Sequence, residues 1–351
     1  MSHSFIYPGA LHIHTTYSDG SGSFPQVIAA AQAAGLRWII VTDHDTQAGA
    51  EFAGWHAGLL VIVGHEITPD HNHFLALNLD HVVSNQLPPQ AFIDAVYAEG
   101  GFGIIAHPDE RVTSRFTEIY RWDDWMIDGP RERAGQTVGL ELWNLMSDWA
   151  EHLTPRNRFV NFLWPKRGLR GPTRATLTWW DQLNMAGKRT FGVGGVDAHA
   201  LKHRVPWGEV EVFPYRWIFK SLTNYLMLDT PLDRDPAKAT QQVYAALRSG
   251  HSYFVNRLDG DAPAIEFYAQ RKNQDAERYG PGDAVSLGGG ELVIKADVGC
   301  RARLRLIRNG VAVAHGRGHL RYVVTHPGVY RLEGRRWGRP WLYSNPIWVR
   351  G

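Results

Sequence analysis

Histidine and carboxylate residues recur at the points where apolar segments of this chain end. Five apolar runs are each followed within a few positions by such a group. The groups are His12 with His14, Asp43-His44-Asp45, Glu66, His107, and Asp197 with His199. The carboxyl ends of strands are where α/β folds assemble their active sites. The repeated placement therefore predicts an α/β fold with one shared polar site, which a single His-x-His pair would not.

Short apolar runs alternate with helical patterns in the first part of the chain. We expect strands at 10–13, 38–42, 59–63, 73–79, 102–106, 138–142 and 190–196, and helices at 25–34, 89–98, 174–186 and 241–249. The first two helices begin with proline and the first three are closely followed by glycine, the usual asymmetry of helix ends. Such alternation is typical of parallel βα units, and its extent favours a closed or nearly closed barrel over an open sheet.

Two regions depart from this pattern. Residues 110–172 are rich in Trp, Arg and Pro, which indicates an insertion: either a solvated segment or oligomer contact, or a lid that offers positive charge to an anionic substrate. After residue 258, short strand-like runs separated by turns such as Asn309-Gly310 predict a small antiparallel β-sandwich. We therefore divide the chain into an N-terminal unit, 1–257, and a C-terminal β unit, 258–351.

Composition limits the classes of partner and ligand. The formal net charge of +2 is too mild to indicate nucleic-acid binding. The single cysteine, Cys300, excludes an intramolecular disulfide and any multi-cysteine zinc site, so a metal would need His and carboxylate ligands. No apolar run approaches the about 20 residues of a membrane span, and the first residues lack a signal-peptide pattern. We expect a cytoplasmic protein without membrane association; its oligomeric state stays open.

The residue types and spacings favour a metal site. His12 and His14, at i and i+2 on a strand, share one face and can address one ion, with Asp19 close behind. The carboxylate of Glu66 can bridge two cations, which a neutral imidazole cannot. The other expected ligands are His44, His73 (with His71 as the fallback), His107, Asp197 and His199. Catalytic work is assigned to Glu66, His107 and Asp197, through the metal-activated hydroxide that they would help to hold.

Other polar residues are candidates for supporting roles. Asp43 or Asp45 would orient an imidazole or anchor a loop, with capping of the next turn as an equal alternative. Glu141 and Asn144, at the end of another expected strand, would support the ligands or contact substrate, although Glu141 would serve equally well as a cap. Arg111 and Arg170 would contact a phosphate group, although a surface role is the simpler reading of each.

As a set, these motifs resemble the PHP (polymerase and histidinol phosphatase) family of metal-dependent hydrolases. The resemblance implies a distorted (β/α)7 barrel with two or three divalent cations, of which Zn, Mn and Fe suit the ligands about equally. It implies one ion on His12, His14, Glu66 and Asp197, a second on Glu66, His73 and His107, and a third on Asp19, His44 and His199. Asp19 stands where some family members have histidine.

A narrower resemblance extends along the whole chain. The segments 141–149, 212–215, 245–250, 306–310 and 344–347 are similar to the CehA/McbA-type branch of PHP-like hydrolases, which carries a C-terminal β domain. That branch includes a carbamate hydrolase, whereas the wider family favours phosphate.

Three functions follow as expectations. The first is hydrolysis of a small phosphorylated substrate, a phosphomonoester or phosphodiester. The second is hydrolysis of a carbamate or carboxyl ester on the same metal site, with Trp122, Trp125, Trp143, Trp149 and Trp164 available for an apolar leaving-group pocket. The third is a non-catalytic scaffold, stabilised by metal, with a binding module at its C-terminus.

Overall fold

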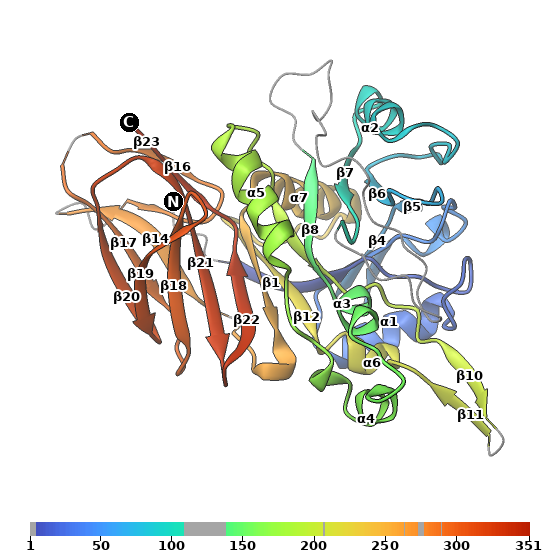
Figure 1. The fold of residues 1–351 in the computed structure, drawn as a ribbon. Coiled ribbons are helices and arrows are strands. Elements are labelled where there is room, and N and C mark those ends of the chain that lie inside the picture. Colours follow the sequence, from blue (N-terminus) through green and yellow to red (C-terminus); the bar gives the residue numbers. More distant parts are fainter. Residues whose placement is uncertain (1–4, 109–137, 206–207, 263, 273–276, 289) are drawn as a thin grey trace.

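The computed structural model describes residues 5–108, 138–205, 208–262, 264–272, 277–288 and 290–351 (Figure 1). The fold is mixed α/β, with large sheets and few helices. The part that carries the site is built on two groups of strands. The first follows the order β13 (Ser252–Asn256), β12 (Leu222–Leu228), β1 (Phe5–Leu11), β2 (Trp38–Val41), β4 (Leu59–Val63) and β3 (Gly54–His56). In it, β1, β2 and β4 run parallel.

The second group of strands is a separate five-stranded sheet. Its order is β5 (His65–Ile67), β6 (Phe74–Leu77), β7 (Phe102–Ile105), β8 (Gly139–Asn144) and β9 (Gly192–Gly195). Two isolated parallel bridges, Ile13 with Ala198 and His44 with Glu66, connect it to the first group of strands. These bridges lie beside the strand ends that carry the candidate ligands.

The expected (β/α)7 barrel is not seen in the part of the chain that the structure describes. The pairs β5–β6 and β6–β7 are antiparallel, as are β1–β12 and β3–β4. The connection from β5 to β6 covers only residues 68–73, whereas a parallel crossover needs about a dozen residues. Apolar runs with polar ends predict strands well, but connection length decides their direction.

In the part of the chain that the structure describes, four helices of at least ten residues cover the sheets. They are α1 (Phe24–Ala33), α2 (Pro89–Ala98), α5 (Arg174–Met185) and α7 (Pro236–Ser249). Helix α2 has the expected bounds, whereas α7 begins five residues earlier than expected, because Asp235 caps it by accepting from the backbone N–H of Ala237. It ends at Gly250, whose φ of 72° suits glycine.

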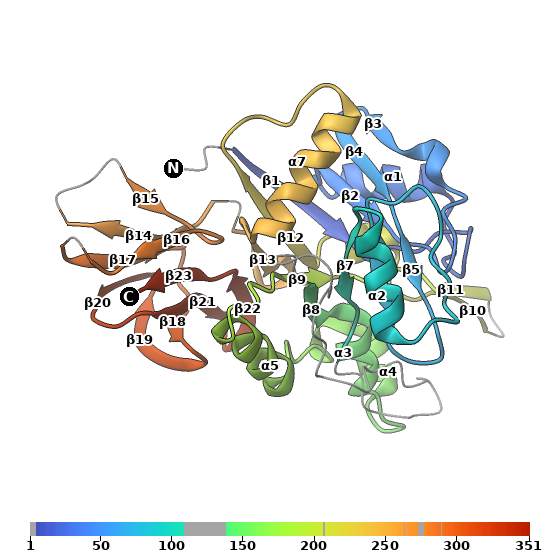
Figure 2. The same ribbon diagram turned by 90° about the horizontal axis from the view of Figure 1, so that it is seen from above.

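Shorter elements lie on the connections. They are α3 (Leu145–Glu151), α4 (Arg158–Leu163), α6 (Tyr215–Ile218), the 3₁₀ turns η1 (Ala50–Phe52), η2 (Pro165–Arg167) and η3 (Arg257–Asp259), and the hairpin of β10 (Lys202–Val205) and β11 (Gly208–Glu211). The hairpin projects from the body of the protein in both ribbon views (Figures 1 and 2). None of the helices in the described ranges is both long and apolar enough to cross a membrane.

The C-terminal strands extend the first sheet instead of standing apart from it. They are β14 (Glu266–Arg271), β15 (Arg278–Tyr279), β16 (Ala284–Ser286), β17 (Leu292–Asp297), β18 (Arg303–Arg308), β19 (Val311–Arg317), β20 (His319–Val324), β21 (Gly328–Arg336), β22 (Arg339–Ser344) and β23 (Ile347–Arg350). The order β15-β14-β17-β20-β19-β18-β21-β22 continues directly into β13, because Tyr253 pairs with Ser344 and Val255 with Leu342. The sheet is antiparallel along this order, and β16 and β23 pair in parallel.

Two turns in this region follow from local chemistry. Asn309-Gly310 joins β18 and β19 with φ values of 50° and 80°, as expected of Asn-Gly in a tight hairpin. Residues 345–346 separate β22 from β23. Pro346 has no N–H for a ladder, and the side chain of Asn345 bonds both the N–H (2.7 Å) and the C=O (3.0 Å) of Gly192.

The described residues form two hydrophobic cores. The larger lies among β1, β2, β4, β6–β9 and the long helices, and the smaller lies among the C-terminal strands, β12 and β13. A buried ion pair connects α5 to β21, in which Arg331 Nε and Nη2 each donate to one oxygen of Asp181 at 2.7 Å. Nη1 of Arg331 donates to Glu333 at 2.6 Å, and its guanidinium lies 5.1 Å from the Trp180 ring. Helix α5 lies beside β21 and β8 (Figure 1).

Candidate metal centre

Three of the candidate ligands, and a residue next to a fourth, have strained backbone. The ligands His12, His107 and Asp197 have positive φ, at 65°, 24° and 48°, and so does Asp45 beside His44, at 48°. Such values are uncommon outside glycine and concentrate at functional sites. We expected His12 and His14 to share one face of a strand, but strand β1 ends at Leu11 and His12 has left-handed backbone. The two rings nevertheless meet, because the Nε2 atoms of both approach the same oxygens of Glu66 and Asp197.

The first donor group joins the first ligand motif of the sequence to the last. Nε2 of His12 lies 3.2 Å from Oε2 of Glu66 and 3.4 Å from Oδ1 of Asp197. Nε2 of His14 lies 3.3 and 3.4 Å from the same two oxygens. Four donor atoms therefore converge on one point, and both histidines are fully buried.

A second group forms around the other oxygen of Glu66. Oε1 lies 3.0 Å from Nδ1 of His73 and 3.5 Å from Nε2 of His107. The donor atoms of His12, Glu66 and His107 come close enough to share an ion. His73 is buried against Glu66, whereas the fallback residue His71 is exposed.

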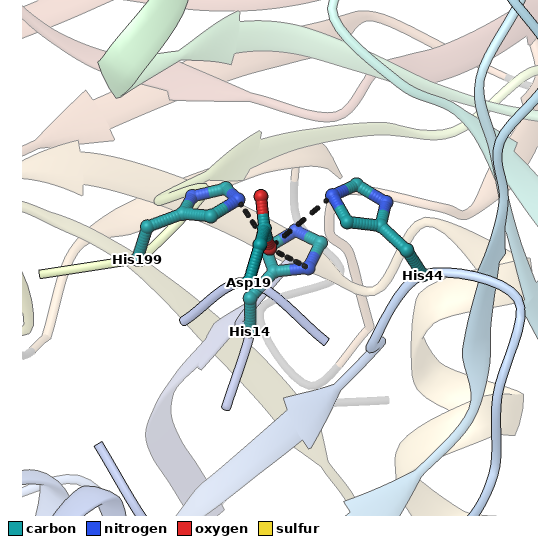
Figure 3. A group of neighbouring side chains, drawn as sticks. All are labelled: His14, Asp19, His44 and His199. Atoms are coloured by element: carbon teal, nitrogen blue, oxygen red, sulfur yellow. Dashed lines mark ion pairs between the residues drawn. The ribbon is translucent and has the colours of Figure 1, made fainter. Parts of the chain in front are cut away.

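The third group is His14, Asp19, His44 and His199, shown in Figure 3. Oδ1 of Asp19 lies 3.2 Å from Nε2 of His199 and 3.4 Å from Nε2 of His44, with Nδ1 of His14 at 3.9 Å. His44 also reaches Glu66, with Nδ1 3.1 Å from Oε2. The third group is more open to solvent than the first, since Asp19 is half-exposed.

The spacing of these donors fits a divalent cation. Ligands about 2.0–2.2 Å from a tetrahedral ion lie about 3.4 Å apart, and the first group matches this spacing. Neither ring nitrogen of the buried His14 makes a hydrogen bond within the described ranges. Buried polar atoms normally have a partner, so these nitrogens suit ligation.

The carboxylates of the cluster are ionised, and positive charge lies beside them. Burial lowers the pKa of His14 to about 3, and His199 and His44 act in the same direction, so this ring is neutral at pH 7. Burial opposes ionisation of Glu66 and Asp197, but the surrounding histidines outweigh it and hold both pKa values well below their usual range. Burial opposes protonation of His12 and His44, but the neighbouring carboxylates outweigh it and raise both pKa values, that of His44 to about 10. A bound cation would replace the positive charge of these two rings beside Glu66 and Asp197.

Glu141 supports this arrangement from behind. Its Oε1 accepts from Nδ1 of His12 at 2.9 Å, and its Oε2 accepts from the backbone N–H of His107 at 2.6 Å. Asn144 donates to Glu141 at 3.0 Å and to Asp197 at 3.1 Å, and its Oδ1 also caps α3. A carboxylate behind an imidazole fixes the ring and its tautomer, leaving Nε2 of His12 directed at the donor group.

Gly195 offers a test of this support. A Cβ at Gly195 would overlap Oε1 of Glu141, and the backbone there is not left-handed. We expect Gly195→Ala to displace the carboxylate and to lower metal affinity about 10–100-fold, the range known for partners of metal ligands. Metal titration monitored by calorimetry measures the change. Gly288→Ala, where the added methyl meets only Oγ of Ser286 at 3.7 Å, is the control, and equal affinities in the two variants would contradict this role of Glu141.

The two aspartates flanking His44 anchor loops. Asp43 accepts from the N–H (2.6 Å) and Oγ1 (2.7 Å) of Thr15 and from Oγ of Ser18 (2.6 Å). Asp45 accepts from the N–H of Thr68 at 3.1 Å and from Asn85 at 2.9 Å. Of the alternatives left open by the sequence, loop anchoring therefore describes both.

The two expected phosphate contacts are not part of the cluster. Arg170 is exposed, and its backbone N–H bonds Asp148. Arg111 lies outside the described residues, as do Trp122 and Trp125. Among the other tryptophans, Trp143 and Trp149 are buried and Trp164 is exposed.

Sequence reasoning missed two residues that hold the ligands. The hydroxyl of Thr68 lies 2.8 Å from Nδ1 of His44. The hydroxyl of Tyr215 donates to the carbonyl oxygens of His14 (2.7 Å) and His199 (3.2 Å), joining the first and last motifs. Neither follows an apolar run in a metal-type motif, so the signal that found the ligands could not find them.

A small pocket opens beside His107. It measures about 50 Å³ and is lined by residues that include Glu141, Trp143, Asn144, Ser147 and Thr173. Asp148 also lines it; burial raises the pKa of its carboxyl to about 6, although the N–H groups of Gly171 and Arg170 oppose the shift. The pocket lies between the donor cluster and helix α3.

Comparison with known proteins gives similarities of limited extent. No family model matches the chain. An uncharacterised protein of Methanocaldococcus jannaschii is 29% identical over 113 residues, which cover 28% of this chain and 66% of that protein. A phosphoribosyl 1,2-cyclic phosphate 1,2-diphosphodiesterase of Eggerthella lenta is 41% identical over 61 residues, or 16% of this chain and 23% of that enzyme. The chain thus matches less than two thirds of the length of either relative.

Two solved structures are similar to the chain. One is a two-domain protein of Bacteroides vulgatus containing a predicted PHP-like metal-dependent phosphoesterase, with 13% identity, a TM-score of 0.39, and coverage of 97% of this chain and 95% of that one. The other is described as a candidate metal-dependent phosphoesterase of Bifidobacterium adolescentis, with 16% identity, a TM-score of 0.35, and coverage of 60% of this chain and 94% of that one. The structural neighbours are thus described as metal-dependent phosphoesterases.

Proposed function

We propose that this protein is a metal-dependent phosphoesterase that hydrolyses phosphomonoesters or phosphodiesters. The observation that carries the proposal is the position of Glu66, whose two oxygens face different donor groups: Oε2 faces His12 and His14, and Oε1 faces His73 and His107. This is the arrangement of a carboxylate that bridges two cations. The similarity to part of an Eggerthella lenta phosphodiesterase supports phosphorus as the reacting centre.

We assign the ligands as follows. His12, His14, Glu66 and Asp197 would hold one ion; Glu66, His73 and His107 a second; and Asp19, His44 and His199 a third, with Zn, Mn or Fe as the candidates. Bound divalent ions supply Lewis acidity and lower the pKa of water toward about 7.

The chain's own groups prepare this chemistry. Glu141 keeps the Nδ1 proton of His12 in place, so that Nε2 carries the lone pair. Asn144 fixes Oδ2 of Asp197 and leaves Oδ1 facing the histidines. Because these contacts exist before substrate arrives, little reorganisation is needed at the moment of reaction.

The pocket beside His107 is the proposed place for the leaving group. Trp143 offers an apolar wall, whereas the hydroxyl groups of Ser147 and Thr173 offer hydrogen bonds to an alcohol portion with hydroxyl groups. In the same proposal, residues 1–257 form the hydrolase unit, 258–351 form an appended β unit, and the chain belongs to the CehA/McbA-type branch.

A substrate panel tests the proposed function. Metal content is measured on purified protein, and kcat/KM is determined for p-nitrophenyl phosphate, bis-(p-nitrophenyl) phosphate, p-nitrophenyl acetate and a p-nitrophenyl carbamate. We expect hydrolysis of at least one phosphate ester, and none of the carbonyl esters. The reverse preference would assign the site to carbonyl chemistry. Absence of all hydrolysis in fully metal-loaded protein would favour the scaffold function.

A further inference from the structure

A hollow lined by arginines lies on the C-terminal sheet, among elements that do not contribute to the metal centre. It measures about 390 Å³, and Arg301, Arg303, Arg317, Arg335 and Trp337 line it. We call these five residues the arginine hollow. Its volume falls in the range of about 300–1,000 Å³ typical of small-molecule sites.

Strand register places three of these arginines in one row. Arg303 on β18 is directly opposite Arg317 on β19 and directly opposite Arg335 on β21. All three are exposed. Like charges directly opposite one another destabilise a sheet, so a row of three guanidinium groups costs folding free energy. A bound anion would remove that cost.

The net charge of +2 for the whole chain does not reveal that positive charge is concentrated in this region. Between Arg301 and Arg339 the sequence has ten arginines, no lysine, and Glu333 as its one acidic residue. Glu333 is buried and already binds Arg331 and Arg305. Within the described ranges, no carboxylate forms an ion pair with Arg301, Arg303 or Arg317, so their charge is available to a ligand.

The choice of arginine indicates the kind of anion. A guanidinium presents a rigid fork of N–H donors that matches the oxygens of phosphate, which an ammonium does not. Arg335 already donates from Nε and Nη2 to the carbonyl of Gly338, at 3.2 and 2.8 Å, and is thereby held at the hollow. A row of such groups suits a ligand with more than one phosphate.

Trp337 adds an aromatic surface to the hollow. It is 77% exposed at the tip of the β21–β22 hairpin, and its φ of 53° precedes a φ of 79° at Gly338. Turns with two positive φ values favour Asn-Gly, and a bulky residue at the first position is strained. The contact recorded for this ring among the described residues is with the guanidinium of Arg336, 5.8 Å from its centroid. A strained and exposed indole gains little from such a contact, so binding of a ligand would account for it.

We propose that the arginine hollow binds nucleotides, with phosphates on the arginine row and the base stacked on Trp337. Sequence-tolerant binding of single-stranded nucleic acid uses this combination of cationic groove and aromatic platform. A free nucleotide offers the same chemistry. The proposal concerns a second site and does not depend on the function proposed for the metal centre.

Binding is measured by fluorescence anisotropy with full-length metal-loaded protein and a fluorescein-labelled oligodeoxythymidine of 15 nucleotides. We expect Arg303→Gln/Arg317→Gln to bind at least tenfold more weakly. The slope of log K against log salt should flatten by about 1.4, because each lost phosphate contact on a single strand removes about 0.7. The unfolding midpoint should stay the same or rise, since the substitution relieves cross-strand repulsion.

Three variants make the result specific. Arg234→Gln/Lys238→Gln removes the same charge at exposed positions near α7 and should leave binding unchanged. Trp337→Asn suits the turn, so it should fold at least as stably and weaken the oligonucleotide about fivefold or more, while competition by inorganic tripolyphosphate is unaffected. Glu66→Gln should bind the oligonucleotide normally, which separates this site from the metal centre.

Competition experiments and the variants distinguish the possible ligands of the arginine hollow. Competition by a non-hydrolysable ATP analogue at micromolar concentration supports a free nucleotide, and competition by unlabelled oligonucleotide alone supports a single strand. Equal losses in the control and in Arg303→Gln/Arg317→Gln would overturn the proposal, as would loss of binding in Glu66→Gln. Binding to phosphatidylserine vesicles without binding to the oligonucleotide would assign the hollow to a membrane surface instead.

Discussion

Replacement of Glu66 by glutamine should remove both bound metal and activity. We expect the purified variant to contain substantially less metal than the wild type and to lose at least about 100-fold in kcat/KM on its best phosphate ester, more than the 10–100-fold effect of residues that merely support ligands. The reason is the central position of this side chain: its two oxygens lie 3.0–3.5 Å from nitrogens of His12, His14, His73 and His107. An amide keeps the volume but loses the negative charge that two cations would share.

Metal content by elemental analysis and kcat/KM measured on the same preparation check this expectation. Glu266→Gln is the matched control, because it makes the same change at an exposed position on β14 and should leave both quantities unchanged. Full metal content in Glu66→Gln, whatever its activity, would refute the bridging role.

Replacement of Asp181 by alanine should have the largest effect on folding. We expect the free energy of unfolding to fall by about 3–5 kcal/mol, the range for breaking a buried ion pair by removing one partner. Arg331 would keep its charge in the interior and lose two hydrogen bonds of 2.7 Å, with Glu333 left as its anionic partner. Denaturation by urea, followed by circular dichroism, gives the difference.

A compensating double variant distinguishes the ion pair from general packing. Asp181→Leu/Arg331→Met replaces both charges by apolar groups and should recover most of the lost stability, since removing both partners is often neutral. A single variant as stable as the wild type would show that Glu333 alone suffices for Arg331. A double variant as unstable as Asp181→Ala would show that the loss comes from packing.

The sequence predicted local elements better than their arrangement. Helix α2 has the expected bounds because proline and glycine mark its ends. The barrel failed as a prediction because parallel pairing requires long connections, and the six residues between β5 and β6 permit an antiparallel pair. Local periodicity of apolar residues indicates whether a segment forms a helix or a strand. The direction of a strand depends on which other strand it pairs with.

For the candidate site, too, some features could be predicted from the sequence and others could not. The strand ends predicted which histidines and carboxylates come together, and the structure places all nine proposed ligands in one cluster. The contacts behind them were harder to foresee: Tyr215 bonds two carbonyl groups from opposite ends of the sequence, and Thr68 bonds His44. The arginine hollow could not be predicted from composition either, because strand register brings Arg303, Arg317 and Arg335 into one row.

The pairing of β13 with β22 has a practical consequence for anyone who wishes to study the metal centre in isolation. Cutting the chain after residue 257 would leave β13 as an edge strand, with the backbone groups that now pair with 342–344 exposed to solvent. It would also uncover Tyr225, Tyr253 and Val255, which the removed strands bury. An unpaired edge beside uncovered apolar side chains is a template for intermolecular strand addition. The two units are therefore better separated by point substitutions within the intact chain than by truncation.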